Sequence, residues 1–91
     1  MDRRRKHVDP EVERQLRDDF YEAVANGSMS VGEAVATMRR ISKLTQPEFA
    51  RHRGISVQAL RQIEADKGNP TIDTLNKVAS IFGLKVGFVP S

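Results

Sequence analysis

The segment TQPEFARHRGISVQALRQIE, residues 45–64, decides the fold because it predicts two short helices joined by a tight turn. Thr45 and Glu48 have the spacing of a capping box, in which each side chain accepts the other residue's backbone N–H, so a helix begins here. Gly54 ends that helix, since glycine readily adopts the left-handed conformation of a helix C-terminus. Ser56 then caps a second helix. The segment therefore predicts a helix, a short turn and a second helix.

Capping signals elsewhere predict the remaining helices. Asp9 and Pro10 favour a helix start, because Asp caps helices and Pro suits their first turn. Ser30 and Glu33 form another capping box. The expected helices span about 10–25, 31–41, 46–53, 57–67 and 71–82.

Apolar residues at helical spacing predict the buried faces of these helices. The terminal stretch 84–89 differs, because its apolar and polar residues alternate with period two, as in a strand. We therefore expect an all-α fold: a compact helical bundle with a helix-turn-helix, an extra N-terminal helix over 10–25 and a short C-terminal strand. The expected buried positions are Val12, Leu16, Phe20, Ala23, Val31, Ala34, Val35, Met38, Ile41, Leu60, Ile63, Ile72, Leu75, Val78, Ala79 and Phe82.

Length and composition narrow the class of protein. A chain of 91 residues predicts one globular domain with a small, mainly aliphatic core. The absence of cysteine excludes a disulfide framework, a thiolate nucleophile and a cysteine-based zinc site. The two histidines have no ligand-spaced companions, and no nucleophile, base and oxyanion arrangement stands out, so we expect no metal, no cofactor and no enzyme activity. No stretch is apolar enough to span a membrane, which favours a cytoplasmic protein.

The formal charge of +3 is unevenly distributed. Residues 2–7 are basic, residues 8–30 carry six acidic side chains, and residues 31–91 are again basic. A basic surface attracts phosphate backbones, whereas an acidic helix is repelled by them and suits water or another protein. The pattern divides the chain into a basic tail with an acidic helix (1–29), a helix-turn-helix domain (30–83) and a terminal strand (84–91).

The motifs together resemble a known family. Residues 44–50 (LTQ-x-x-FA), 54–64 (GIS-x-x-x-L-x-x-IE) and 68–75 (GNPT-x-x-TL) closely resemble the phage-repressor-like (Cro/C1, or Xre) helix-turn-helix family, over about residues 31–83. The resemblance implies a compact five-helix domain that binds double-stranded DNA. The acidic helix over 10–25 is an addition to that pattern.

The second helix of the motif carries the expected base-reading residues. With Leu60 and Ile63 buried, its outer face presents polar side chains that suit base edges: glutamine for adenine, arginine for guanine, and a valine methyl for thymine. The alternative is that these side chains are only solvated helix formers. The candidate base-contacting residues are Val57, Gln58, Arg61 and Gln62.

A second set is expected to contact DNA phosphates. The family resemblance gives this role to Gln46 and to the Ser56 cap, while helix ends and loops would place the other members beside the groove. For Arg51, Arg53, Lys67 and Asn69 an ordinary solvated surface side chain is an equal alternative. The basic tail could lie along DNA phosphates or in a minor groove, with a disordered terminus as its equal alternative. The candidate phosphate-contacting residues are Gln46, Arg51, Arg53, Ser56, Lys67 and Asn69.

The resemblance also implies an interior ion pair between Arg39 and Glu64. In the family, the matching positions join one helix to another inside the domain. Sequence periodicity alone does not indicate such a pair, so two exposed charges remain the alternative reading.

The sequence thus favours a homodimeric, sequence-specific repressor that binds an inverted repeat. Members of this size with an extra helix and a terminal strand resemble the HipB-like and HigA-like antitoxins, which would add a toxin protein as partner. We expect Leu84, Val86 and Phe88 to form the dimer contact by antiparallel pairing of the segment with its copy, the alternative being a frayed tail. A protein-interaction module with incidental DNA binding is the competing function. The sequence indicates neither the operator nor the toxin.

Overall fold

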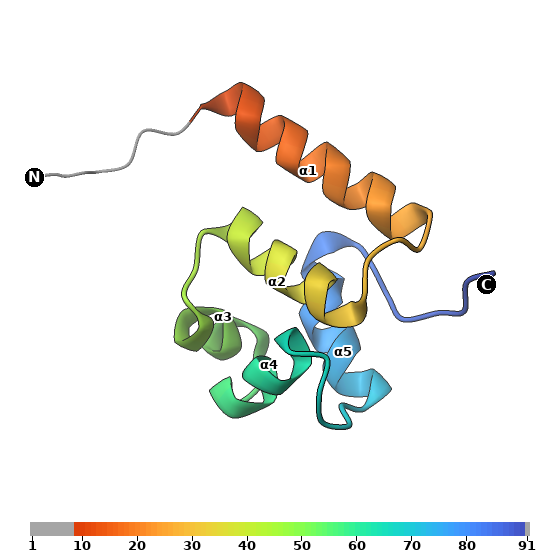
Figure 1. The fold of residues 1–91 in the computed structure, drawn as a ribbon. Coiled ribbons are helices and arrows are strands. Elements are labelled where there is room, and N and C mark those ends of the chain that lie inside the picture. Colours follow the sequence, from red (N-terminus) through yellow and green to blue (C-terminus); the bar gives the residue numbers. More distant parts are fainter. Residues whose placement is uncertain (1–8, 91) are drawn as a thin grey trace, which may run out of the picture.

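The computed structural model describes residues 9–90, and within them every regular element is helical (Figure 1). The predicted all-helical fold is therefore confirmed, whereas the basic cluster at residues 2–7 lies outside the described residues. None of the helices described is long and apolar enough to cross a membrane. The elements are α1 (Pro10–Ala25), α2 (Val31–Ser42), α3 (Gln46–Arg53), α4 (Val57–Glu64), α5 (Ile72–Ala79) and the 3₁₀ helix η1 (Ser80–Phe82).

Local capping fixes where the helices begin. Ser30 Oγ accepts the backbone N–H of Glu33 at 3.0 Å, and the Glu33 carboxylate accepts that of Ser30 at 2.9 Å. Thr45 and Glu48 repeat this arrangement at the start of α3. Both capping boxes are confirmed, because each needs only groups three residues apart.

Two helix ends differ from the expected ones. α4 was expected to reach about residue 67 but ends at Glu64, because Asp66 adopts a left-handed conformation with φ of 56°. Its carboxylate accepts a hydrogen bond from the Gly32 backbone N–H at 2.7 Å, so a contact with α2 competes with continuation of the helix. α5 ends at Ala79, and the chain reaches Phe82 through the tighter turn of η1.

One hydrophobic core joins all the helices. Its fully buried side chains are Phe20, Phe49, Leu60 and Val78, each exposed by no more than 1%. Phe20 comes from α1 and packs edge-on against Phe82, with ring centroids 5.7 Å apart. α1 thus contributes to the same core as the helix-turn-helix.

Three positions expected to be buried are exposed. Val12 is 63% exposed on the first turn of α1. Val31 and Ile72 are 51% and 64% exposed, each at the first residue of its helix. Helical periodicity selects the correct face of these helices, but their ends extend past the core.

The strand expected over residues 84–89 is not seen. Residues 83–90 contain neither helix nor strand, and the described chain offers no other strand to accept its backbone hydrogen bonds. Leu84 packs against the core, and the Val86 N–H donates to Asn76 Oδ1 at 2.8 Å. This C-terminal tail (residues 84–90) therefore lies against the body without forming a sheet.

Candidate nucleic-acid interface

The turn between α3 and α4 holds the two helices in a fixed relation. Gly54 has φ of 72°, a left-handed conformation that a side chain disfavours, and the Ile55 N–H donates to the Ala50 carbonyl at 3.0 Å. Ser56 Oγ then accepts the Ala59 N–H at 3.0 Å and begins α4. Three residues therefore separate α3 from α4, as in a DNA-binding helix-turn-helix.

α4 has one buried and one polar face. Leu60 and Ile63 are 0% and 3% exposed and pack in the core, whereas Gln58, Arg61 and Gln62 are exposed. Val57, expected on the outer face, is half-buried and packs against the core. Three of the four candidate base-reading side chains therefore share an accessible surface, and the fourth is only partly available.

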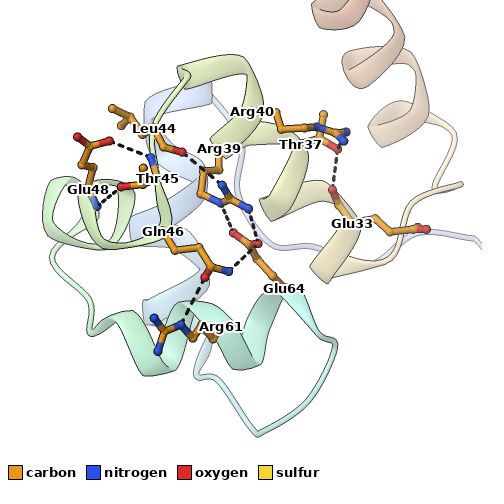
Figure 2. A network of polar contacts seen from close by, with 10 residues as sticks. All are labelled: Glu33, Thr37, Arg39, Arg40, Leu44, Thr45, Gln46, Glu48, Arg61 and Glu64. Atoms are coloured by element: carbon orange, nitrogen blue, oxygen red, sulfur yellow. Dashed lines mark hydrogen bonds and ion pairs between the residues drawn. The ribbon is translucent and has the colours of Figure 1, made fainter.

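Arg39 of α2 and Glu64 of α4 form a bidentate ion pair (Figure 2). The Arg39 Nε donates to one carboxylate oxygen at 2.7 Å and a terminal nitrogen donates to the other at 3.0 Å. The two side chains are 24% and 10% exposed. A half-exposed surface pair would contribute little, but this pair is mostly shielded from water.

The pair shifts the protonation of both groups toward their charged forms. Burial opposes ionisation of the Glu64 carboxyl, but hydrogen bonds from Arg39 and Gln46 and the Arg39 charge outweigh it and hold its pKa below the usual value. The hydrogen bond from the guanidinium to Glu64 raises the pKa of Arg39. Arg39 also donates to the Leu44 carbonyl at 3.3 Å, so the pair connects α2 to the start of α3 as well.

Gln46 extends this network to the outer face of α4 (Figure 2). Its Nε2 donates to Glu64 at 3.2 Å, and its Oε1 accepts from Arg61 Nε at 3.4 Å. Gln46 was expected to contact a phosphate, and Arg61 to read a base. The structure brings both side chains together with the interior pair, so α2, α3 and α4 are linked by one set of polar contacts.

The remaining candidate phosphate contacts lie on two segments. Arg51 is exposed on the last turn of α3, and Lys67 and Asn69 are exposed in the loop between α4 and α5. Arg53 differs, because its guanidinium lies 4.3 Å above the Phe49 ring and its buried Nε has no hydrogen-bond partner. Burial also lowers the pKa of Arg53. Only the terminal nitrogens of Arg53 are therefore placed to meet a phosphate.

Sequence reasoning missed two residues that position α4. A Cβ on Gly32 would lie 2.7 Å from the carbonyl oxygens of both Ile63 and Glu64, a distance that side chains do not tolerate. Asp66 binds the N-terminus of α2 through the Gly32 N–H and the Ser30 hydroxyl, both at 2.7 Å. The sequence offered one signal, which is the glycine at position 32 inside the Ser30–Glu33 capping box. Glycine weakens a helix, so a glycine at this position indicates that another backbone packs closely against it.

Comparison with known proteins agrees with this geometry. A helix-turn-helix family model matches residues 35–89, more than half of the chain. The chain belongs to the helix-turn-helix family. The matched segment of this helix-turn-helix protein contains the whole of α3, α4 and α5.

Two relatives extend the comparison. The immunity repressor protein of Bacillus phage phi105 is 36% identical over 61 residues, which cover 67% of this chain and 42% of the repressor. The HTH-type transcriptional regulator y4dJ of Sinorhizobium fredii is 39% identical over 54 residues, which cover 59% of this chain and 70% of that protein. The chain thus spans less than half the length of the phage repressor. No solved structure matches the chain significantly.

Proposed function

We propose that the protein is a sequence-specific transcriptional repressor that binds an inverted-repeat operator as a homodimer. The observation that carries the proposal is the two-faced character of α4. Gln58, Arg61 and Gln62 are exposed, while Leu60 on the opposite face is completely buried. A helix with a fixed apolar face and a free polar face can enter the major groove as a rigid reader.

Base readout follows from the chemistry of that face. Gln58 and Gln62 each offer a donor and an acceptor that match the edge of adenine, and Arg61 matches guanine O6 and N7. Arg61 can turn toward a base because only the long hydrogen bond to Gln46 restrains its Nε. Val57 supplies at most a peripheral apolar contact, since it is half-buried.

Phosphate contacts would flank the reading helix on both sides. Arg51 lies at the end of α3, and Lys67 and Asn69 follow α4. Ser56 and Gln46 lie at the starts of α4 and α3, where free backbone N–H groups also favour phosphate. Arg53 joins them only through its terminal nitrogens.

A binding experiment on the DNA upstream of the gene tests this proposal. Gln58→Ala combined with Gln62→Ala should lower discrimination between that DNA and random duplex by about 30-fold or more, since each of the two base contacts is worth about 1–3 kcal/mol. Arg51→Ala should weaken both complexes equally, because phosphate contacts carry no sequence information. Gln15→Ala, an exposed glutamine on α1, is the matched control. Unchanged discrimination in the double variant would exclude α4 as the reading helix.

In this proposal the C-terminal tail forms the homodimer contact through Leu84, Val86 and Phe88. Val86 and Phe88 remain exposed in the single chain, so a partner can bury them. Truncation after Leu84 keeps this half-buried side chain in the body and removes the rest of the tail. The truncated protein should sediment as a monomer and bind the operator weakly, whereas an unchanged dimer would place the contact on the helices.

An antitoxin role is the finer part of the proposal. α1 lies on the opposite side of α2 from α4, and its acidic Glu11, Asp18, Asp19 and Glu22 are exposed (Figure 1). A toxin with a basic surface could bind to α1 while α4 is bound to DNA. This arrangement also supports the alternative of a protein-interaction module.

Co-expression with the product of an adjacent gene tests the antitoxin role. Asp18→Asn with Asp19→Asn should reduce neutralisation of a toxic neighbour and leave DNA binding intact. The Gln58 and Gln62 double variant should do the reverse. Neutralisation without any DNA binding by the unaltered protein would favour the interaction module. If the product of the adjacent gene is not toxic, the antitoxin role is excluded.

A further inference from the structure

An apolar groove of about 240 Å³ lies between the C-terminal tail and the body of the protein. α1, α2, α5 and the tail all contribute to its walls. The groove is open to solvent and mainly apolar, so its exposure to water is unfavourable. Its main lining residues are Val24, Met29, Ala34, Leu75, Leu84 and Val86.

The tail supplies one wall of this groove but leaves its largest side chain outside. Leu84, Val86 and Val89 line the groove, and a Cβ on Gly27 would lie 3.6 Å from Val89 Cγ2. Strict alternation along a strand would place Phe88 on the same side as Leu84 and Val86. Phe88 instead is fully exposed and does not line the groove. In this conformation its ring cannot enter the groove of its own chain.

We propose that Phe88 of each protomer inserts into the groove of the other protomer in the homodimer. This inference rests on the homodimer of the proposed function and names the contact that holds it. A twofold axis that brings one Phe88 to the partner's groove necessarily brings the partner's Phe88 to the first groove. The exchange buries the two Phe88 rings that the separate chains expose to water, and it fills two grooves with apolar side chains.

The groove is also placed to connect dimerisation with DNA reading. It shares Val31 and Leu75 with a neighbouring hollow, which Pro70 and Gly68 of the α4–α5 loop also line. A Cβ on Gly68 would lie 3.3 Å from the Cβ of Gln62, so this loop packs directly on the reading helix. A partner seated in the groove would therefore adjoin the segment that follows α4 and set the relative position of two reading helices.

Cysteine cross-linking tests the contact without background, because the chain contains no cysteine. Full-length Phe88→Cys and Val31→Cys chains, carrying different tags, are mixed and mildly oxidised. Val31 lines the groove and is half-exposed, so a disulfide between the two chains is expected. The matched control pairs Phe88→Cys with Ile81→Cys, an exposed apolar position that does not line the groove.

The outcomes separate this inference from the homodimer itself. A cross-link to residue 31 well above that to residue 81 supports the inserted ring. A dimer by sedimentation with no preference for residue 31 overturns the insertion and leaves the homodimer in place. A protein that stays monomeric at all concentrations overturns both. Self-linking of Val86→Cys without the 88–31 link would identify a tail-to-tail ribbon and also overturn the insertion.

A double-mutant cycle gives a second measurement. Phe88→Ala should weaken the dimer by about tenfold or more, since it removes a buried aromatic ring. Ala34→Met should fill the groove and weaken the dimer in a similar way, and the two changes together should be no worse than either alone. Ile81→Ala is the control and should leave the dimer unchanged. Independent, additive losses would show that residues 34 and 88 do not meet.

Discussion

The two sides of α2 are joined to their neighbours by different kinds of contact. Toward α4, the backbones approach closely at Gly32, and the Arg39–Glu64 pair is mostly buried. Toward α1, Phe20 is buried in the core that it shares with α2, and the ion pair of Glu13 with Lys43 is partly exposed. Figure 1 shows α2 between these two neighbours.

The difference indicates separate tasks for the two sides. An apolar contact stabilises in proportion to the area removed from water and tolerates small changes of angle. A bidentate ion pair and a backbone contact require one geometry. We therefore expect changes on the α1 side to lower stability alone, and changes on the α4 side also to lower DNA affinity per folded molecule.

Phe20→Ala should produce the largest loss of stability, about 3–5 kcal/mol, because it leaves a cavity in the core. The free energy of unfolding in urea measures it. The fraction that stays folded should bind operator DNA normally. A loss of affinity in that fraction would show that α1 also orients α4 and would end the distinction between the two sides.

Glu64→Gln should cost about 2–3 kcal/mol, since it leaves Arg39 without a charged partner in a place that is only 24% exposed. It should also reduce DNA affinity at temperatures where the variant is fully folded. Arg39→Met combined with Glu64→Leu should recover most of the stability but not the affinity. Recovery of both would show that the pair has no orienting role.

The same variant gives a pH test. Because the pKa of Glu64 is lowered by folding, its contribution is present above the unfolded glutamate pKa of about 4.3 and is lost as the pH falls through the folded value. The stability difference between the unaltered protein and Glu64→Gln should therefore shrink below about pH 4. A constant difference across that range would exclude the carboxylate charge as its source.

Gly32→Ala should cost about 1–3 kcal/mol, because the added methyl group would overlap two backbone carbonyls of α4. The helices must move apart, so DNA affinity should fall as well. Gly87→Ala is the control, since no atom lies within 4 Å of a Cβ built there. Equal effects of the two substitutions would indicate that α2 and α4 are not closely packed in solution.

Tyr21→Phe should cost about 1 kcal/mol by removing one hydrogen bond on the α1 side. The Tyr21 hydroxyl donates to the Phe82 carbonyl at 2.9 Å and connects α1 to η1. Thermal unfolding measures the loss, and DNA affinity should not change. A larger loss would mean that this hydrogen bond, and not the burial of Phe20, holds α1 in place.

Glu13→Gln should have the smallest effect, about 0–1 kcal/mol. Glu13 pairs with Lys43, but both side chains are partly exposed and water weakens their attraction. The difference should disappear in high salt. A loss as large as that of Glu64→Gln would contradict the distinction between a buried and an exposed ion pair.

Much of the site was predictable because its signals are local. Ser56 and Gly54 fix the turn within a few residues, and the spacing of Leu60 and Ile63 selects the buried face of α4. The outward position of Gln58 follows from that face. Val57 and Arg53 were placed less well, because their packing against the core depends on residues distant in sequence.

The sequence by itself determined where the helices begin, since a cap needs only a hydroxyl or carboxylate and an N–H within three residues. Only the tertiary structure decided where α4 ends, because Asp66 leaves the helix to bind the N-terminus of α2. It also decided that Phe20 of α1 is buried while Val12 is not, and that the C-terminal tail is not a strand. These outcomes depend on contacts between segments far apart in the chain. The periodicity of one segment does not indicate which other segments it will contact.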